Sequence, residues 1–347
     1  MIYIPFLEKR ILGIDLGSIN TKIVEVVKKK NFFEVVNFGV IPIINFKEIA
    51  SHSYILEETI ARMLSEFLQT SKAKTRGVIL SLPAPYVFSV NFFVPDIPEK
   101  SLSQVIRFES QKQIPLSLEE IELEYRYIRF EIENQPKQWL VYLVATPKNY
   151  LKRLQSIAEI AKLKLIDYSS EYFNLEPYFN NLLGTYVVVD LGHSYSLLIL
   201  IKNGKVIYGN RLKIRGYDFL ETISNLTNYS EKDTLDLVYK KGFRFLPEEK
   251  ELKEIANNFL NNISNMLPSE IEKLENTFLL KIDKIYWTGG ISALPGFREE
   301  MISRLSKYQQ EILLPYELFK GEKFLGLKEK GTIFSQALGV VFRKFMR

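Results

Sequence analysis

Short apolar runs that end in small polar residues mark the start of each half of the chain. The stretch ILGIDLGSINTKIVEV, residues 11–26, predicts two strands joined by a turn at 17–21. The stretch YVVVDLGHSYSLLILI, residues 186–201, repeats this arrangement, and a third strand is expected after each hairpin. The recurrence predicts a duplicated unit of three strands followed by helices, and therefore two related lobes with a cleft between them.

Helical and strand periods alternate along the rest of the chain, which predicts an α/β protein. Ser101 is the expected N-cap of a helix that ends before Pro115. Pro268 is expected to split a helical run into two helices, and Pro295 to lie in the first turn of another helix. The expected helices are 57–69, 101–114, 147–163, 249–278 and 331–347, and the expected further strands are 76–83, 86–95, 121–128, 139–146 and 281–287.

Composition narrows the possible functions. The 46 basic and 41 acidic residues are spread along the chain and the basic runs are short, so no nucleic-acid surface is expected. The absence of Cys excludes disulfides and thiolate chemistry, and His52 and His193 alone leave little room for a histidine-based site. No signal peptide and no apolar run of about 18 residues is recognisable, so a cytoplasmic location without membrane insertion is expected.

The two hairpin turns have the residues that phosphate binding requires. Gly17 and Gly192 are expected to allow positive φ, so that consecutive amides close on an anion. Asp15 and Asp190 lie where the preceding strands end and are expected to hold Mg²⁺ through water, while the cation offsets the phosphate charge. The expected short donors beside these turns are Ser18, Asn20, Thr21, Ser194 and Ser196.

A third glycine turn follows a strand in the second half. Thr288, Gly289 and Gly290 let the backbone pass close to a ligand at the start of a helix, although a plain strand-to-helix turn explains them as well. Neither a P-loop nor a G-x-G-x-x-G motif is present. Together with the two hairpins, this turn favours a nucleotide that is bound at both of its ends.

These motifs resemble a known superfamily. GIDLGSINTKI resembles the first phosphate hairpin of the superfamily of actin, sugar kinases and heat-shock chaperones. VVDLGHSYSLLIL resembles the second phosphate hairpin of that superfamily, and IYWTGGISALPGF resembles its adenosine motif. The three motifs occur in the same order as in the superfamily. QVIRFESQKQIPLSLEEIELEYRYI resembles the inserted subdomain of the type IV pilus assembly protein PilM family, and LVYLVATPKNYLKRL and SQALGVVFR are also similar to that family. The resemblance covers nearly the whole chain.

The resemblance implies an actin-like, ribonuclease H-like, duplicated two-lobed fold that binds ATP and Mg²⁺. It implies a first lobe at 1–183 with an inserted α/β subdomain at about 96–130. The second lobe is 184–347, with its final helix returning to the first lobe. The implied nucleotide-binding residues are Asp15, Gly17, Ser18, Asn20, Thr21, Lys22, Asp190, Gly192, His193, Ser194, Gly216, Gly289, Gly290 and Ile291, with Asp15 and Asp190 as the Mg²⁺ residues.

The chain departs from the family pattern near the expected nucleotide. Arg215 replaces the first of two glycines after the second hairpin, His193 stands where a small residue is usual, and Ile291 where a third glycine is common. Glu171, at the start of the connecting helix, is expected to orient water with Asp190 as the other catalytic residue; an ordinary helix N-terminal glutamate is the alternative. At most a slow ATPase is expected.

The family resemblance also implies a role and partners. A cytoplasmic scaffold of a type IV pilus or related secretion machine is expected, peripheral to the inner membrane through a partner. That partner would be a PilN-like bitopic protein whose N-terminal peptide binds within 85–130, and a pilus motor ATPase would be a further partner. The alternatives are a type II secretion component, a division protein similar to FtsA, or a small-molecule kinase.

Overall fold

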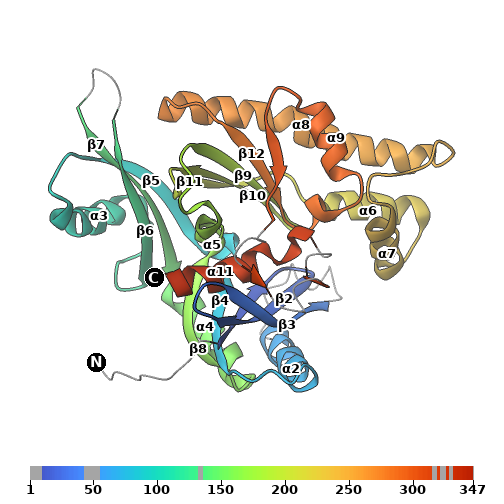
Figure 1. Ribbon diagram of the computed structural model, residues 1–347, viewed down its shortest axis with the longest axis horizontal. Helices are drawn as coiled ribbons and strands as arrows, with labels where there is room; N and C mark the ends of the chain where they lie inside the picture. Colours follow the sequence, from blue (N-terminus) through green and yellow to red (C-terminus); the bar gives the residue numbers. More distant parts are fainter. Residues whose placement is uncertain are drawn as a thin grey trace. The chain divides into compact units, whose positions relative to one another are not determined.

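The computed structural model describes residues 10–42, 55–131, 136–314, 319–320, 326–327 and 331–346. These residues form two compact units (Figure 1). The first unit takes the described residues within Met1–Asn180 and Pro315–Arg347, and the second is Asn181–Leu314. Residues 1–9, on which the expected absence of a signal peptide rests, lie outside the described residues. Each unit is described by itself below.

The first unit is built on a sheet whose strands, among the described residues, lie in the order β14-β3-β2-β1-β4-β8. The first three strands of the chain pair antiparallel; β4 adds parallel to β1, β8 parallel to β4, and β14 parallel to β3. The apolar residues of the central strands are buried on both faces, as expected for a sheet covered on both sides. The strands are β1 Arg10–Leu16, β2 Asn20–Lys28, β3 Phe33–Pro42, β4 Gly77–Leu82, β8 Lys164–Ser170 and β14 Phe319–Lys320.

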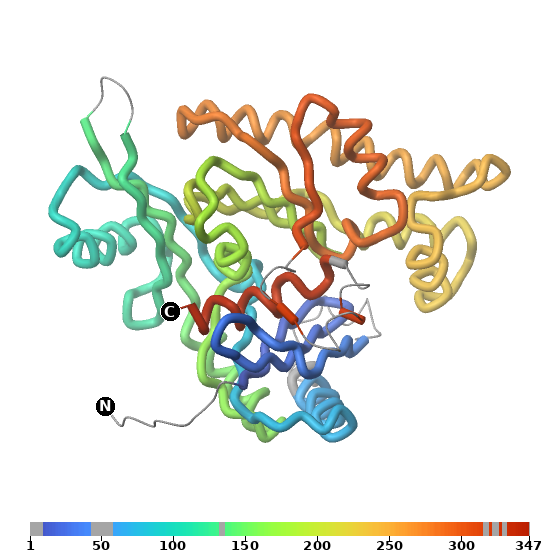
Figure 2. The backbone as a smooth tube through the Cα atoms, in the orientation of Figure 1, coloured from blue at the N-terminus to red at the C-terminus, as the bar shows by residue number. Residues whose placement is uncertain are grey.

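Helices from distant parts of the chain cover this sheet. α2 (Ile55–Thr70) and α4 (Lys148–Ile160) pack on one face, and α11 (Ser335–Met346) packs on the other. Figure 2 shows the C-terminal helix beside the N-terminal strands of this unit. The approach is close, because a Cβ atom at Gly13 of β1 would collide with the Ala337 carbonyl oxygen of α11. Alanine at position 13 would therefore overpack this joint.

A small three-stranded sheet belongs to the same unit, with the strand order β5-β7-β6 among the described residues. Its core is closed by α3, which packs Leu102 and Ile106 against Trp139 and Val141 of β7. Contrary to the sequence prediction, Ser101 is not the N-cap of α3; the helix begins at Glu99 after Pro98, which suits a helix start because it lacks an amide hydrogen. The elements are β5 Phe88–Pro95, α3 Glu99–Gln113, β6 Ile121–Phe130 and β7 Gln138–Pro147.

The second unit repeats the strand plan of the first. Its described strands lie in the order β11-β10-β9-β12-β13, again three antiparallel strands followed by two parallel ones. Asn203 and Gly204 both take positive φ in the predicted β10–β11 hairpin turn. This match confirms the predicted duplication. The strands are β9 Thr185–Leu191, β10 Ser196–Lys202, β11 Lys205–Leu212, β12 Lys284–Thr288 and β13 Gln310–Ile312.

Two proline predictions in the second unit are wrong. Pro268 does not split its run, because α8 is one helix from Lys250 to Phe278 that keeps a continuous buried face through the proline. Burial of that face outweighs the lost backbone hydrogen bond. Pro295 lies before α9, not in its first turn, and Gly296 with φ of 83° is the N-cap. The other helices here are α6 Gly216–Thr227, α7 Glu231–Lys241 and α9 Phe297–Arg304.

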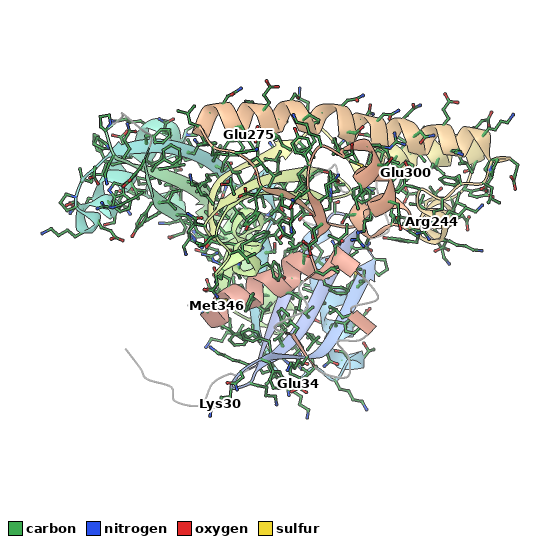
Figure 3. The ribbon with its side chains drawn as sticks, turned by 45° about the horizontal axis from the view of Figure 1, so that its top comes forward. Lys30, Glu34, Arg244, Glu275, Glu300 and Met346 are labelled. Atoms are coloured by element: carbon green, nitrogen blue, oxygen red, sulfur yellow. The ribbon has the colours of Figure 1, made fainter. Side chains whose placement is uncertain are left out.

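The helices α8 and α9 are joined by one arginine. Arg304 of α9 donates to Asn257 of α8 at 2.7 Å and to Glu300 of its own helix at 2.9 Å. Glu300 is labelled in Figure 3, on the helix that follows the Thr288-Gly289-Gly290 turn, which is called the adenosine-type turn below. This polar joint attaches the helix after Thr288 and the glycines to the long helix of the same unit.

Candidate nucleotide site

The first predicted phosphate-binding region is the end of the β1–β2 hairpin, in the first unit. Asp15 is the sixth of the seven residues of β1 and is 4% exposed. It pairs with Lys22 of β2 and with Ser81 of the parallel strand β4. The Lys22 ammonium lies 3.3 Å from Asp15 Oδ2, whereas Oδ1 is buried without a hydrogen-bond partner. A buried carboxylate oxygen without a partner is the kind of group that a hydrated cation or another donor would satisfy.

The end of the β9–β10 hairpin, in the second unit, repeats this register. Asp190 is again the sixth of the seven residues of β9, and it pairs with Leu197 of β10 and Thr288 of the parallel strand β12. Each aspartate therefore lies between a hairpin partner and a hydroxyl residue of a parallel strand. The predicted Thr288-Gly289-Gly290 turn starts from the residue beside Asp190, so the second hairpin and the adenosine-type turn are neighbours in one unit.

The hairpin glycines are needed for close approach and not for positive φ. Gly17 and Gly192 are not among the described residues with positive φ, so that part of the sequence prediction is wrong. A Cβ atom at Gly17 would lie 2.7 Å from the Asn20 carbonyl oxygen, and one at Gly192 would collide with the Tyr195 carbonyl oxygen. Both collisions are with the residue three positions on, because each hairpin reverses within that span.

The N-terminus of α6 holds the second hairpin in place. The Gly216 amide donates to the Gly192 carbonyl at 3.0 Å, and the Tyr217 amide donates to the His193 carbonyl at 2.8 Å. These two amides of the helix are therefore occupied by the hairpin backbone. A Cβ atom at Gly216 would also lie 2.9 Å from the Ile291 side chain, so this glycine lets the helix approach both glycine turns of the unit.

Gly289 and Gly290 differ in their surroundings. Gly289 has φ of 89°, and a Cβ atom there would collide with Asp190 Oδ1 and with the backbone of Leu191. At Gly290 a Cβ atom would meet nothing within 4 Å. The first glycine is thus required by packing on the β9–β10 hairpin, while the second leaves space at the surface of the turn.

The departures from the family pattern gather around the start of α6. Arg215 binds Asp218 through two nitrogen–oxygen contacts of 2.5 and 3.1 Å, and this partner raises the pKa of the guanidinium. The His193 ring meets the Tyr217 ring edge-on at 5.6 Å. The Tyr217 hydroxyl donates to Glu221 at 2.5 Å, and this hydrogen bond raises the pKa of the tyrosine. Where the family pattern has a glycine, this chain therefore has the charged Arg215, next to the aromatic rings of His193 and Tyr217.

The hairpin ends, each taken within its own unit, have residues that fit a phosphate with a hydrated cation. Besides Asp15 Oδ1, the Thr21 and Thr288 hydroxyls are buried without hydrogen-bond partners, and both lie beside the hairpin turns. The described residues hold no group of three or more acidic, histidine or cysteine side chains placed for a metal ion. Any Mg²⁺ at these hairpins would therefore rely on single carboxylates, water and phosphate oxygens, which is the usual coordination of this ion.

Glu171 has a defined structural partner. It is buried as the first residue of α5 (Glu171–Asn174), and its carboxylate accepts a hydrogen bond from the Ala84 amide at 2.8 Å. Ser170 caps the same helix by accepting from the Tyr172 amide. The carboxylate thus ties the connecting helix to the turn after β4. Its role in orienting water stays a prediction.

A second candidate site lies within the first unit, beside the small sheet. A hollow of about 300 Å³ is lined by strands β6 and β8, each the terminal strand of its sheet, and by Thr146 of β7. Three of its lining residues, Glu122, Glu124 and Asp167, are acidic, and Arg126 is the only basic one among the lining residues described. Two terminal strands with an acidic lining form a surface on which an extended basic segment could add.

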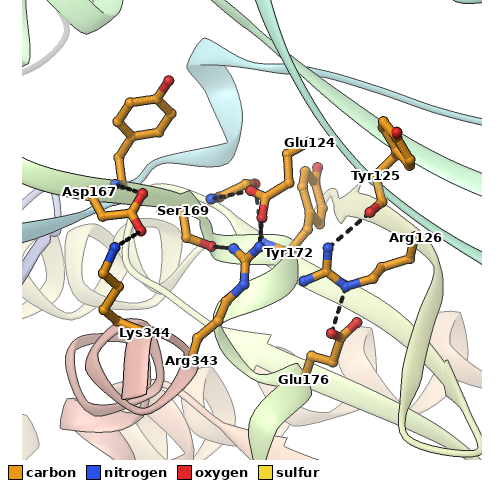
Figure 4. A network of polar contacts seen from close by, with 11 residues as sticks. Glu124, Tyr125, Arg126, Asp167, Ser169, Tyr172, Glu176, Arg343 and Lys344 are labelled. Atoms are coloured by element: carbon orange, nitrogen blue, oxygen red, sulfur yellow. Dashed lines mark hydrogen bonds and ion pairs between the residues drawn. The ribbon is translucent and has the colours of Figure 1, made fainter. Parts of the chain in front are cut away.

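A polar network that sequence reasoning missed includes four of the residues that line this hollow, Glu124, Tyr125, Arg126 and Asp167 (Figure 4). Arg343 of α11 is buried and binds both Glu124 of β6 and Ser169 of β8. Arg126 donates to Glu176 at 2.6 Å and lies 4.6 Å from the centre of the Phe173 ring. These contacts attach the small sheet to the connecting helix and to the C-terminal helix.

The comparisons with known proteins agree with this architecture. The family profile described as type IV pilus assembly protein PilM matches residues 13–345. A chain of a PilM–PilN type IV pilus biogenesis complex is similar with a TM-score of 0.78 at 21% identity, over 96% of this chain and 97% of that one. Among the described residues, no helix combines the length and the apolar character that crossing a bilayer requires.

Two further solved structures share the fold. The ethanolamine utilization protein EutJ from Carboxydothermus hydrogenoformans gives a TM-score of 0.56 at 12% identity, over 97% of this chain and 91% of that one. MreB5 of Spiroplasma citri bound to ADP gives 0.52 at 10% identity, over 97% of each chain. With the duplicated sheets, these likenesses confirm the predicted actin-like α/β fold.

Proposed function

The chain belongs to the PilM family of type IV pilus assembly proteins, and on that premise we propose that it is a scaffold that binds ATP with Mg²⁺ and holds the tail of a membrane partner. The observation that carries the nucleotide part is the repeated register of Asp15 and Asp190 at the ends of two equivalent hairpins. The solved MreB5 structure that shares this fold is bound to ADP. The proposed location is the cytoplasmic surface of the inner membrane.

The chain's own residues would perform most of the binding. Gly17 and Gly192 keep the hairpin turns tight, so that the nearby amides and hydroxyls can approach phosphate oxygens. Asp15 and Asp190 would hold Mg²⁺ through water, and the ion would supply the positive charge that offsets the phosphates. Gly290, whose Cβ position is open, leaves room for the ligand beside the adenosine-type turn.

We expect hydrolysis of ATP to be slow or absent. The carboxylate of Glu171, the group proposed to orient water, already accepts the Ala84 amide, and Arg215 and Ile291 alter two glycine positions of the family pattern. A phosphate-release assay with Mg-ATP tests this expectation. Turnover in the usual enzyme range of about 1–10³ s⁻¹ would show that the chain is an enzyme and not a scaffold.

The partner is proposed to be the N-terminal cytoplasmic tail of a bitopic, PilN-like inner-membrane protein. Segments on the cytoplasmic side of membrane helices carry an excess of Lys and Arg. Three of the eight lining residues of the hollow between β6 and β8 are acidic and one is basic, and both strands are terminal in their sheets. The hollow therefore offers some charge complementarity, together with main-chain hydrogen bonds, to such a tail. The solved similar chain comes from a PilM–PilN complex. A pilus motor ATPase is proposed as a further partner.

Charge reversal in the hollow tests this placement. Glu122→Lys changes an exposed lining residue, whereas the matched control Glu119→Lys changes an exposed glutamate just before β6. We expect Glu122→Lys to weaken binding of a labelled basic tail peptide about tenfold, and Glu119→Lys to leave it unchanged. Fluorescence anisotropy measures both. Equal binding by both variants, or crosslinking of the peptide to the second unit, would show that the partner site lies elsewhere.

A further inference from the structure

The Lys22 ammonium occupies the space above the first phosphate turn. It lies 3.3 Å from Asp15 Oδ2, and a Cβ atom at Gly17 would lie 2.5 Å from it. The Lys22 side chain is 19% exposed and the Asp15 side chain 6% exposed. The cation is therefore held partly out of water, between a buried carboxylate and the glycine on which a phosphate is proposed to bind.

The hairpin fold does not require this lysine. In the second unit the residue opposite Asp190 is Leu197, which is buried, and the same three-stranded arrangement forms there. Lys22 therefore has a role in the first hairpin alone. We infer that it compensates the charge of Asp15, because a buried carboxylate without a compensating cation is costly.

We propose that Lys22 is a resident cation of the first phosphate hairpin that changes partners when nucleotide binds. Without nucleotide it compensates Asp15; with nucleotide it contacts the phosphates, and Mg²⁺ compensates Asp15 in its place. This inference rests on the proposed nucleotide binding. It implies that Lys22 and Mg²⁺ partly replace each other. Removing both should therefore reduce the free energy of ATP binding by more than the sum of the two single removals.

The first test is the ATP affinity of the full chain and of Lys22→Met, with and without Mg²⁺. We expect the substitution to weaken ATP binding about tenfold with Mg²⁺, because the ion still offsets the phosphate charge. Without Mg²⁺ neither cation remains, and we expect binding to weaken about a hundredfold. An equal loss in both buffers would overturn the exchange of partners. If the unchanged chain binds ATP in neither buffer, the proposed nucleotide binding itself fails.

A matched control lysine lies just after β2, in the connection to β3. Lys29 pairs with Glu34 at 2.9 Å, on the exposed surface where Figure 3 labels Lys30 and Glu34. Lys29→Met removes the same charge without touching the phosphate turn. It should leave the ATP affinity unchanged in both buffers, and a loss equal to that of Lys22→Met would reduce the effect to net charge.

The second test needs no nucleotide. In buffer without ATP and Mg²⁺, Lys22→Met should lower the midpoint of thermal unfolding by about 4 °C, because it leaves the buried Asp15 carboxylate without its cation. Adding Asp15→Asn to the same chain should restore most of that loss. A Lys22→Met chain as stable as the unchanged one would contradict the role of resident cation.

Discussion

Asp15→Ala and Asp190→Ala should each weaken Mg-ATP binding by about 2–3 kcal/mol, which is about 30- to 150-fold. Each change removes one of the two strand-end carboxylates that are proposed to hold hydrated Mg²⁺. The phosphates then lose the offsetting charge of the ion. Displacement of a fluorescent ATP analogue measures the affinities of both variants.

The same experiment contains its control. Asp236 is exposed on α7, away from both hairpins in sequence, and Asp236→Ala should leave the affinity unchanged. In Mg²⁺-free buffer Asp15→Ala should not weaken binding, since the carboxylate is proposed to act through the ion and without it competes with the phosphates for Lys22. Unchanged Mg-ATP affinity in both Asp15→Ala and Asp190→Ala would show that the hairpin carboxylates do not form the nucleotide site.

Arg343→Met should destabilise the first unit by about 2–4 kcal/mol. Methionine keeps much of the length of the side chain but leaves Glu124 without its partner in the buried network (Figure 4). The adjacent Lys344 pairs with Asp167 at 2.9 Å on a more exposed surface, so Lys344→Met should cost less than about 1 kcal/mol. Urea unfolding, followed by probes in each unit, measures the difference.

A double variant separates the charge from the packing. Adding Glu124→Gln to Arg343→Met removes the charge that the single change leaves uncompensated, so part of the lost stability should return. If Arg343→Met lowers the free energy of unfolding no more than Lys344→Met does, the network does not stabilise the packing of the small sheet against the rest of the first unit. The peptide hollow would then have to be stabilised by other contacts.

The fold could be predicted because its signals are local. Apolar strands that end in Asp-x-Gly turns appear twice, and the period of the pattern gives the strands without knowledge of their partners. The prediction of positive φ at Gly17 and Gly192 was wrong. These glycines are needed because a Cβ atom would collide with the residue three positions on, and that contact depends on how tightly each hairpin closes. The prediction that Pro268 ends a helix was wrong because the helix is stabilised by burial on both sides of the proline, which is a tertiary effect.

The candidate site was predicted only in part, for a related reason. The phosphate-hairpin residues lie within two short stretches, so their chemistry is legible in sequence. Arg343, by contrast, reads as the basic end of an amphipathic helix, and its burial depends on Glu124 in a distant strand. The pairing of Lys22 with Asp15 is local and follows from strand register, and counting residues across the hairpin would have found it.

Calorimetric titration of ATP into the unchanged chain, with and without Mg²⁺, tests the central claim most directly. The account predicts saturable binding of one ATP per chain with Mg²⁺, and an affinity about a hundredfold lower without it, because two carboxylates at the hairpins need the ion. Absence of saturable binding in Mg²⁺ buffer, by a chain that circular dichroism shows to be folded, would contradict it.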